Sequence, residues 1–290
     1  MATNTPFGQR LGLVLEGGAM RGIYTAGVLD VFLEAGIIPD VVVGVSAGAL
    51  HGCSYVAGQK GRSIRYYRKY RSDKHFMGLY SLLTTGDVVG TKFCYEDIPL
   101  RLDPFNEAAF EKAPVDFYVT VTNVRTGKPE YILCDELKVG SKMDVIRAGA
   151  SMPLCSKMVE WNGNLYLDGG VSDSIPYAKM KDFGCRKSIV VLTQPAGYLK
   201  QPAAMAPFEA MYRKYPAFVE AMRGRDQMYN TEVCAVEQAA KQGDVFLIRP
   251  SKLLHVGRME HDIEVLNAQY ELGRQDARNQ MDAMREWIER

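Results

Sequence analysis

The chain has 290 residues, of which 47% are hydrophobic and 24% charged, proportions typical of a globular protein that buries its core without a disulfide or a metal. Its 35 Lys and Arg are balanced by 34 Asp and Glu, which argues against nucleic acid as a partner. The six cysteines form no CxxC pair, so a zinc ribbon or thioredoxin-type motif is excluded and buried free thiols are expected.

The N-terminal ten residues lack the apolar stretch of a secretory signal. No segment approaches the ~18 uncharged apolar residues of a membrane span. We therefore expect a cytoplasmic protein whose contact with a membrane, if it makes one, is peripheral.

The first 60 residues alternate between short apolar runs and amphipathic stretches. Residues 11–15 predict a strand that ends at a Gly-rich turn, and residues 22–35 predict a helix because apolar side chains recur about every 3.6 positions. Val41, Val42 and Val43 begin a second strand, which leads through a sharp turn into a helix ending near Ala57. This alternation predicts an α/β fold of three layers, with a central, mostly parallel sheet between helices.

The later segments continue this pattern without a repeat or a long linker. A hairpin is expected around Asn162-Gly163, a surface loop over 195–207, and one long helix or two consecutive helices over 259–288. We predict a single domain over 1–290, with a core at about 10–195 and the C-terminal part 196–290 packed on it. Further strands are predicted at 115–123, 130–134, 159–161, 165–167, 188–193 and 245–248.

The segment Gly44-Val45-Ser46-Ala47-Gly48 matches the G-x-S-x-G pattern and lies between a valine-rich strand and a helix. A serine in that context sits on a tight turn with its hydroxyl above the sheet, where the start of the helix favours developing negative charge. The sequence therefore indicates a nucleophile at Ser46. The alternative is a tight turn whose serine only caps the helix.

A second motif, Glu16-Gly17-Gly18-Ala19-Met20-Arg21-Gly22, follows the first strand. Glycines in this position let backbone N–H groups point at an anion, either a pyrophosphate or an oxyanion. The dinucleotide fingerprint G-x-G-x-x-G is not met, and no acidic residue ends the second strand to bind a ribose. A purely structural turn remains the other alternative.

Asp168-Gly169-Gly170 ends a later strand, where the aspartate is either part of a turn or a general base for the serine. A Ser-His-Asp triad in the usual order of this fold class needs a late histidine, which only His255 and His261 provide. Neither lies in a Gly-rich or strand-end context. His51, five residues after Ser46, is expected to face away from it.

The order and context of these motifs resemble the patatin-like phospholipases, in particular their compact bacterial members. A fourth stretch, Ala148-Gly149-Ala150-Ser151-Met152-Pro153, resembles the A-S-x-x-x-P-type segment found between the last two motifs of that family. The resemblance covers about residues 10–195. It implies hydrolysis of lipid esters through an acyl-serine, without metal or cofactor.

The resemblance also implies residue roles. Ser46 is the expected nucleophile and Asp168 the expected base, forming a dyad without histidine. The N–H groups of Gly17, Gly18 and Ala19 are expected to form the oxyanion hole, where alanine replaces the usual glycine at Ala19 and costs ~1–2 kcal/mol if its φ is positive. The supporting residues are Arg21, Gly44, Gly48, Gly169 and Gly170.

One segment between residues 62 and 74 interleaves basic side chains with three tyrosines. It predicts either a solvated amphipathic helix or a peripheral contact with anionic lipid head groups. The expected partner is a lipid or ester substrate. The alternative to an active hydrolase is a weak or inactive lipid-binding or regulatory protein on the same fold. Substrate class, positional specificity and oligomeric state are not determined by the sequence.

Overall fold

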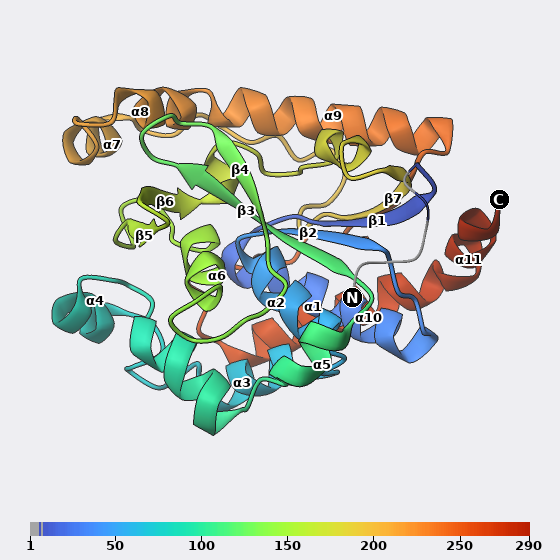
Figure 1. The fold of residues 1–290 in the computed structure, drawn as a ribbon, viewed down its shortest axis with the longest axis horizontal. Helices are drawn as coiled ribbons and strands as arrows, with labels where there is room; N and C mark the ends of the chain where they lie inside the picture. Colours follow the sequence, from blue (N-terminus) through green and yellow to red (C-terminus); the bar gives the residue numbers. More distant parts are fainter. Residues whose placement is uncertain (1–5, 7) are drawn as a thin grey trace.

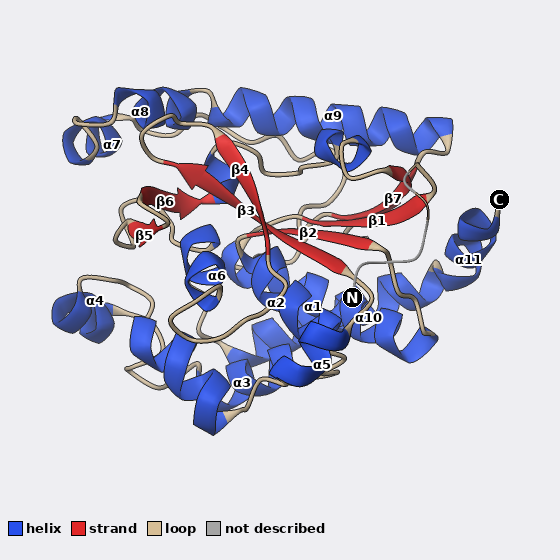
Figure 2. Cartoon of the chain, viewed as in Figure 1, coloured by secondary structure: helices blue, strands red, loops and turns tan. Residues whose placement is uncertain are grey.

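The centre of the molecule is an eight-stranded sheet, in a computed structural model that describes residues 6 and 8–290. The strand order is β5-β6-β3-β2-β1-β7-β8, and β4 pairs with β3. Parallel pairs join β3, β2, β1, β7 and β8, whereas β4, β5 and β6 are antiparallel additions at one edge (Figure 2). The strands are β1 (Arg10–Leu15), β2 (Val41–Val45), β3 (Asp116–Asn123), β4 (Pro129–Leu133), β5 (Val159–Trp161), β6 (Asn164–Asp168), β7 (Cys185–Val191) and β8 (Val245–Ile248).

Helices cover both faces of this sheet (Figure 1). Successive side chains of a strand point to opposite faces, so Leu13 and Leu15 pack in the cluster of Phe32, while Val14 packs in the cluster of Tyr229. The predicted α/β fold with a mostly parallel sheet between helices is confirmed. The helices are α1 (Ile23–Ala35), α2 (Ala47–Val56), α3 (Arg62–Tyr70), α4 (Leu79–Thr85), η2 (Phe93–Leu102), α5 (Glu107–Lys112), α6 (Met143–Gly149), α7 (Ala206–Met211), α8 (Pro216–Arg223), α9 (Arg225–Gln242), α10 (Ile263–Asn279) and α11 (Met281–Glu289), with short turns η1 (Ala19–Gly22), η3 (Gly169–Val171) and η4 (Ala178–Lys181).

The C-terminal helix α10 packs directly against α1, and two glycines permit the contact. A Cβ atom on Gly27 would lie 2.1 Å from the carbonyl oxygen of Tyr270, and one on Gly273 would lie 2.1 Å from that of Tyr24. Both distances are far inside van der Waals contact. The two backbones therefore touch at positions where no side chain fits.

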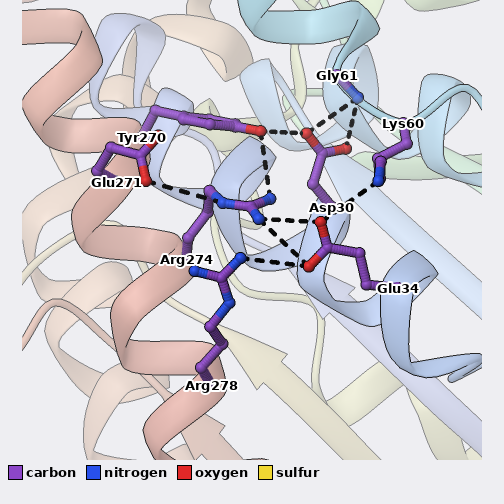
Figure 3. Close-up of polar contacts among 8 residues, drawn as sticks. All are labelled: Asp30, Glu34, Lys60, Gly61, Tyr270, Glu271, Arg274 and Arg278. Carbon is purple, nitrogen blue, oxygen red and sulfur yellow. Dashed lines mark hydrogen bonds and ion pairs between the residues drawn. The ribbon is translucent and has the colours of Figure 1, made fainter.

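Polar contacts reinforce this helix pair (Figure 3). The Tyr270 hydroxyl donates to Asp30 at 2.5 Å, and the backbone N–H of Gly61 donates to both carboxylate oxygens of Asp30 at 2.9 and 3.0 Å. Arg274 pairs with Glu34 at 2.9 Å. Asp30 of α1 thus binds both α10 and the turn before α3.

The C-terminal part also extends the sheet, because β8 pairs with β7 in parallel. Two consecutive helices, α10 and α11, end the chain, which is one of the two arrangements predicted. The packing of α10 on α1 and of β8 on β7 supports the single domain predicted over 1–290. That division of the chain stays a prediction. All six cysteines are free, but Cys234 is exposed, so the expectation that all are buried is wrong for that residue.

Within the described residues, no helix combines the length and the apolar character that a bilayer span requires. The expectation that the N-terminus carries no secretory signal rests largely on residues 1–5 and 7, which lie outside the described part of the chain.

Candidate active site

Ser46 occupies the sharp turn between β2 and α2. Its backbone has φ 52° and ψ −122°, a conformation that L-residues rarely adopt and that marks a functional turn when the surroundings enforce it. Gly44 and Gly48 make the turn possible, because a Cβ atom on either would lie within 2.5 Å of backbone atoms of Ala49 or Leu15. The predicted strand-turn-helix context of Ser46 is thus present.

Asp168, the last residue of β6, contacts Ser46 after β2, and the strand β3 lies between these two strands. The Ser46 hydroxyl donates to Asp168 Oδ2 at 2.7 Å, and both residues are buried, with exposed fractions of 8% and 6%. The pairing of β6 with β3 sets the position of Asp168 beside Val121, and the Thr122 hydroxyl donates to its carbonyl oxygen at 2.8 Å. Two residues separated by 122 positions in sequence thus form one hydrogen-bonded pair.

The second oxygen of Asp168 is also occupied. Oδ1 accepts the backbone N–H of Gly170 at 2.8 Å, while Gly169 continues the same turn. Burial raises the pKa of Asp168, and the hydrogen bond from Ser46 and the nearby charge of Arg225 oppose that rise. A buried carboxylate with a raised pKa and a serine hydroxyl in contact is suited to accept a proton.

The Gly-rich loop after β1 lies against this pair. A Cβ atom on Gly17 would lie 2.8 Å from the Ser46 Cβ, and one on Gly18 would lie 2.7 Å from Thr193 Oγ1. Ala19 has φ 50°, so it occupies the left-handed region that favours glycine. Within the described residues, the N–H groups of these three residues have no hydrogen-bond partner, which leaves them available to an anion.

Two charged side chains accompany the loop. Arg21 closes its turn by donating its backbone N–H to Gly18 O at 3.1 Å, and its Nε is buried without a partner among the described residues. Glu16 is buried, and its carboxylate accepts the backbone N–H of Thr193 at 2.5 Å. Burial raises the pKa of Glu16. Sequence reasoning noted Glu16 only as part of the motif, but the structure shows that it fastens the loop to the end of β7.

The four histidines lie away from Ser46 and Asp168. None of them lines either of the cavities that meet at Ser46 within the described chain. His51 is buried against Tyr67, and burial lowers its pKa to about 3. His75 pairs with Asp73 at the surface. A histidine therefore has no contact through which to act on Ser46.

An apolar cavity begins at Ser46, with an empty volume of about 910 Å³, part of it open to solvent. Its wall comes from α2, α3, η2 and α6. The lining residues include Leu50, Tyr66, Tyr67, Phe76, Ile98 and Ile146. Such a cavity suits the hydrocarbon chain of a fatty-acyl group.

Two of the three tyrosines of the basic and aromatic segment, Tyr66 and Tyr67, belong to this wall. Tyr66, Tyr67 and Tyr70 are buried rather than exposed to a membrane. Arg62 is buried with its guanidinium donating to the Asp103 carbonyl at 2.9 Å, and Arg71 is buried and donates to Glu260 O at 2.7 Å. Arg65, Arg68 and Lys69 are exposed, so the segment forms the predicted amphipathic helix with a solvated basic face, and a contact of that face with lipid head groups stays a prediction. The alternation of basic and aromatic residues in the sequence did not indicate that Arg62 and Arg71 are buried together with the tyrosines.

A second cavity, of about 950 Å³ with open solvent included, shares Ser46 and Ala19 with the first. Asp168 lines it, together with basic side chains from the loop after β7 and from the C-terminal part. Sequence reasoning missed these basic residues, because they lie outside all the motifs. The polar lining residues are Glu16, Arg21, Lys200, Arg225, Tyr229 and Arg258.

Comparison with known proteins gives two family matches. The sequence model described as "Patatin-like phospholipase" matches residues 13–180, which include Ser46 and Asp168. A second model, described as "Domain of unknown function (DUF6363)", matches residues 215–289. The two matched regions meet at the polar cavity, since the second includes Arg225 and Arg258.

The chain is also similar to individual proteins. The chain is 28% identical to the uncharacterized protein YjjU of Escherichia coli over 91% of this chain and 75% of that protein. It is 30% identical to lysophospholipase nte1 of Aspergillus terreus over 61% of this chain but only 11% of that much longer protein. Among solved structures, VipD of Legionella pneumophila aligns with a TM-score of 0.48 and 13% identity, covering 96% of this chain and 67% of that one.

The family match covers more than half of the chain. It spans the strand, turn and helix that carry Ser46, the Gly-rich loop and the strand that ends at Asp168. Lysophospholipases are among the relatives. This chain belongs to the patatin-like phospholipase family and is a lipid ester hydrolase.

Proposed function

We propose that this protein hydrolyses fatty-acyl esters through a Ser46-Asp168 dyad and a covalent acyl-serine. The observation that carries the proposal is the 2.7 Å hydrogen bond from Ser46 to the buried Asp168, at the point where an apolar and a polar cavity meet. In this arrangement the acyl chain occupies the apolar cavity, and the alcohol that leaves occupies the polar one.

The first half of the reaction is acyl transfer to Ser46. Asp168 Oδ2 takes the hydroxyl proton as Ser46 Oγ attacks the ester carbonyl, and the carbonyl oxygen becomes an oxyanion. The N–H groups of Gly17, Gly18 and Ala19 are the donors proposed to stabilise it, and loss of one such donor costs ~10²–10³ in rate. The intermediate then collapses, the carbonyl–alkoxide bond breaks, and the proton on Asp168 passes to the leaving alcohol.

The second half of the reaction repeats the same steps with water. Asp168, again ionised, takes a proton from a water molecule as its oxygen attacks the acyl-serine carbonyl. The Ser46–acyl bond breaks, Ser46 recovers the proton, and the fatty acid leaves. The raised pKa of Asp168 supports this role, because a carboxylate with higher proton affinity is a stronger base for a serine hydroxyl.

A fluorophosphonate probe tests the nucleophile directly. We expect the wild-type protein to be labelled on Ser46, as mapped by peptide mass spectrometry, and Ser46→Ala to lose both labelling and release of fatty acid. Ser174→Ala is the matched control, because Ser174 is another buried serine that lines the polar cavity. Labelling at Ser174, or full turnover by Ser46→Ala, contradicts the proposal. An unlabelled wild type that still binds lipid indicates the non-catalytic alternative.

A further inference from the structure

Four basic side chains converge on the polar cavity from distant parts of the chain. Arg21 comes from the Gly-rich loop, Lys200 from the loop after β7, Arg225 from the first turn of α9, and Arg258 from the segment before α10. Two of the four, Arg225 and Arg258, belong to the C-terminal region of unknown function at 215–289.

The hydrogen bonds and ring contacts of these cations are made to neutral groups. Arg225 Nε donates to the Gly170 carbonyl at 2.5 Å, Lys200 Nζ lies 4.1 Å from the centre of the Tyr229 ring, and Arg21 Nε is buried without a partner among the described residues. These partners are neutral groups. Guanidinium groups offer several donors in one plane, and the recorded contacts use few of them.

The two carboxylates of the cavity are already engaged. Glu16 accepts the Thr193 N–H, and Asp168 accepts from Ser46 and Gly170. Four cations facing two carboxylates leave an excess of positive charge. Burial and the neighbouring charges of Arg225, Arg21 and Arg258 lower the pKa of Lys200 to about 8, and the charge of Glu16 opposes this shift.

We propose that Arg21, Lys200, Arg225 and Arg258 form a subsite for a phosphate group next to the scissile ester, and that the region 215–289 thereby selects phosphate-bearing lipids over neutral glycerides. The proposal rests on the proposed function. Arg and Lys groups around one cavity match the charge and the several oxygens of a phosphate. The cavity shares Ser46 and Ala19 with the apolar one, so one ligand spans both.

Arg225 is tied to the turn of Asp168, since it donates to the carbonyl of the residue two positions after Asp168. It raises the local positive potential at Asp168 as well as facing the cavity. Lys200 and Arg258 make no hydrogen bond to the turn after Asp168 among the described residues, and the charge of Lys200 acts on Asp168 less than that of Arg225. Their replacement should therefore disturb Ser46 and Asp168 less than replacement of Arg225 does.

The kinetic test compares two substrates that share one acyl chain: 1-palmitoyl-glycerol 3-phosphate and 1-palmitoyl-glycerol, both in detergent micelles. We expect the wild type to prefer the phosphate ester at least ~10-fold in kcat/KM. The neutral lipid leaves the four cations of the subsite without a phosphate partner, and a site with unpaired polar groups rejects such an analogue strongly. The double variant Lys200→Gln/Arg258→Gln is expected to lose that preference and to hydrolyse the neutral lipid within about threefold of wild type. Arg213→Gln/Lys252→Gln, which removes two exposed cations outside the cavity, is the control.

Equal losses on both substrates, or an unchanged preference, overturn the subsite. A second measurement is independent of turnover and uses Ser46→Ala. Glycerol 3-phosphate and inorganic phosphate are titrated by calorimetry, and we expect binding of glycerol 3-phosphate to weaken at least ~10-fold when Lys200→Gln/Arg258→Gln is added. Binding of inorganic phosphate with equal affinity identifies a free-anion site rather than a head-group site and contradicts the selection of lipids. If hydrolysis fails but this binding behaves as expected, only the proposed function is wrong.

Discussion

The two cavities that meet at Ser46 differ in both their chemistry and their origin. The apolar cavity is walled by α2, α3, η2 and α6, all within the region that matches the phospholipase family. The polar cavity takes Arg225, Tyr229 and Arg258 from the C-terminal region. The proposed catalytic pair and the apolar wall thus belong to one region, while two of the four cations of the polar cavity belong to the other. Under the two proposals above, the C-terminal region modifies which ester is cleaved and leaves the bond-breaking step to the family region.

The largest expected effect comes from Asp168. It lines the polar cavity, but as the proposed base it is needed for every ester, whatever occupies the two cavities. Asp168→Asn keeps the shape and removes the proton acceptor, so turnover should fall about 10²–10⁴-fold while the protein stays folded. In the proposed mechanism, the ionised form of Asp168 is the active base. The rate should therefore rise with pH through a carboxyl pKa that lies above the usual range, because burial raises it.

A fourfold variant with Gln at His51, His75, His255 and His261 is the matched comparison for Asp168→Asn. We expect it to keep turnover and the same rising limb of the pH profile, measured as kcat/KM for a p-nitrophenyl ester. A single histidine variant that stays folded but falls to the activity of Ser46→Ala contradicts the dyad.

The second effect sharpens the contrast between the cavities. Leu50, half-buried on α2, lines only the apolar one. Leu50→Trp narrows it, so kcat/KM for a palmitoyl ester should fall at least ~10-fold while a butyryl ester is little affected, because each buried methylene contributes ~1–3 kcal/mol to discrimination. Met211→Trp, at an exposed position on α7, should change neither value. Equal losses for short and long chains show that the acyl group binds elsewhere.

A smaller effect concerns Ala19, which lines both cavities. Ala19→Gly relieves ~1–2 kcal/mol of left-handed strain and costs up to ~1 kcal/mol through the greater freedom of the unfolded chain. We expect the melting temperature to stay level or rise slightly, and the rate of labelling by the fluorophosphonate probe to stay level or rise. A lower melting temperature without faster labelling shows that the Ala19 methyl group serves only packing.

The last effect is on stability alone, with none expected on catalysis, and concerns His51, which is buried against Tyr67 of the apolar wall. Its folded pKa of about 3 lies below the unfolded value of ~6.5, so its contribution to stability is present above pH ~6.5 and is lost as pH falls toward 3. Between pH 7 and 5 this costs about 2 kcal/mol. Urea unfolding of His51→Gln should lack that part of the pH dependence, whereas the exposed His261→Gln should retain it. Parallel curves for His51→Gln and wild type contradict this account.

Much of the fold was predictable because the signals are local, and the family resemblance indicated that Ser46 and Asp168 lie together. Strand β2 and the turn at Ser46 follow from three valines and two glycines in one short segment. The hairpin at Asn162-Gly163 likewise depends on neighbouring residues. Asp168 was a candidate because it lies at a strand end. The order of the motifs along the chain then gave the family resemblance that paired it with Ser46.

The walls of the two cavities were not predictable in this way. Tyr66 and Tyr67 lie among basic residues, and only tertiary packing shows that they face the apolar cavity. Lys200 was expected on a surface loop, and Arg258 belongs to no motif. Their convergence depends on the position of the C-terminal helices over the sheet, which no short sequence pattern encodes.

The glycine contact between α1 and α10 has a consequence for the order of biosynthesis. The Asp30–Tyr270 hydrogen bond joins residues 240 positions apart, and α1 has no other helix that reaches its Gly27 side so closely within the described chain. At ~5–20 residues per second, the ribosome needs on the order of 10–50 s to make the intervening segment. During that interval the face of α1 that later meets α10 is uncovered. A nascent chain of this protein is therefore expected to need a chaperone, or a slow final docking step, until α10 emerges.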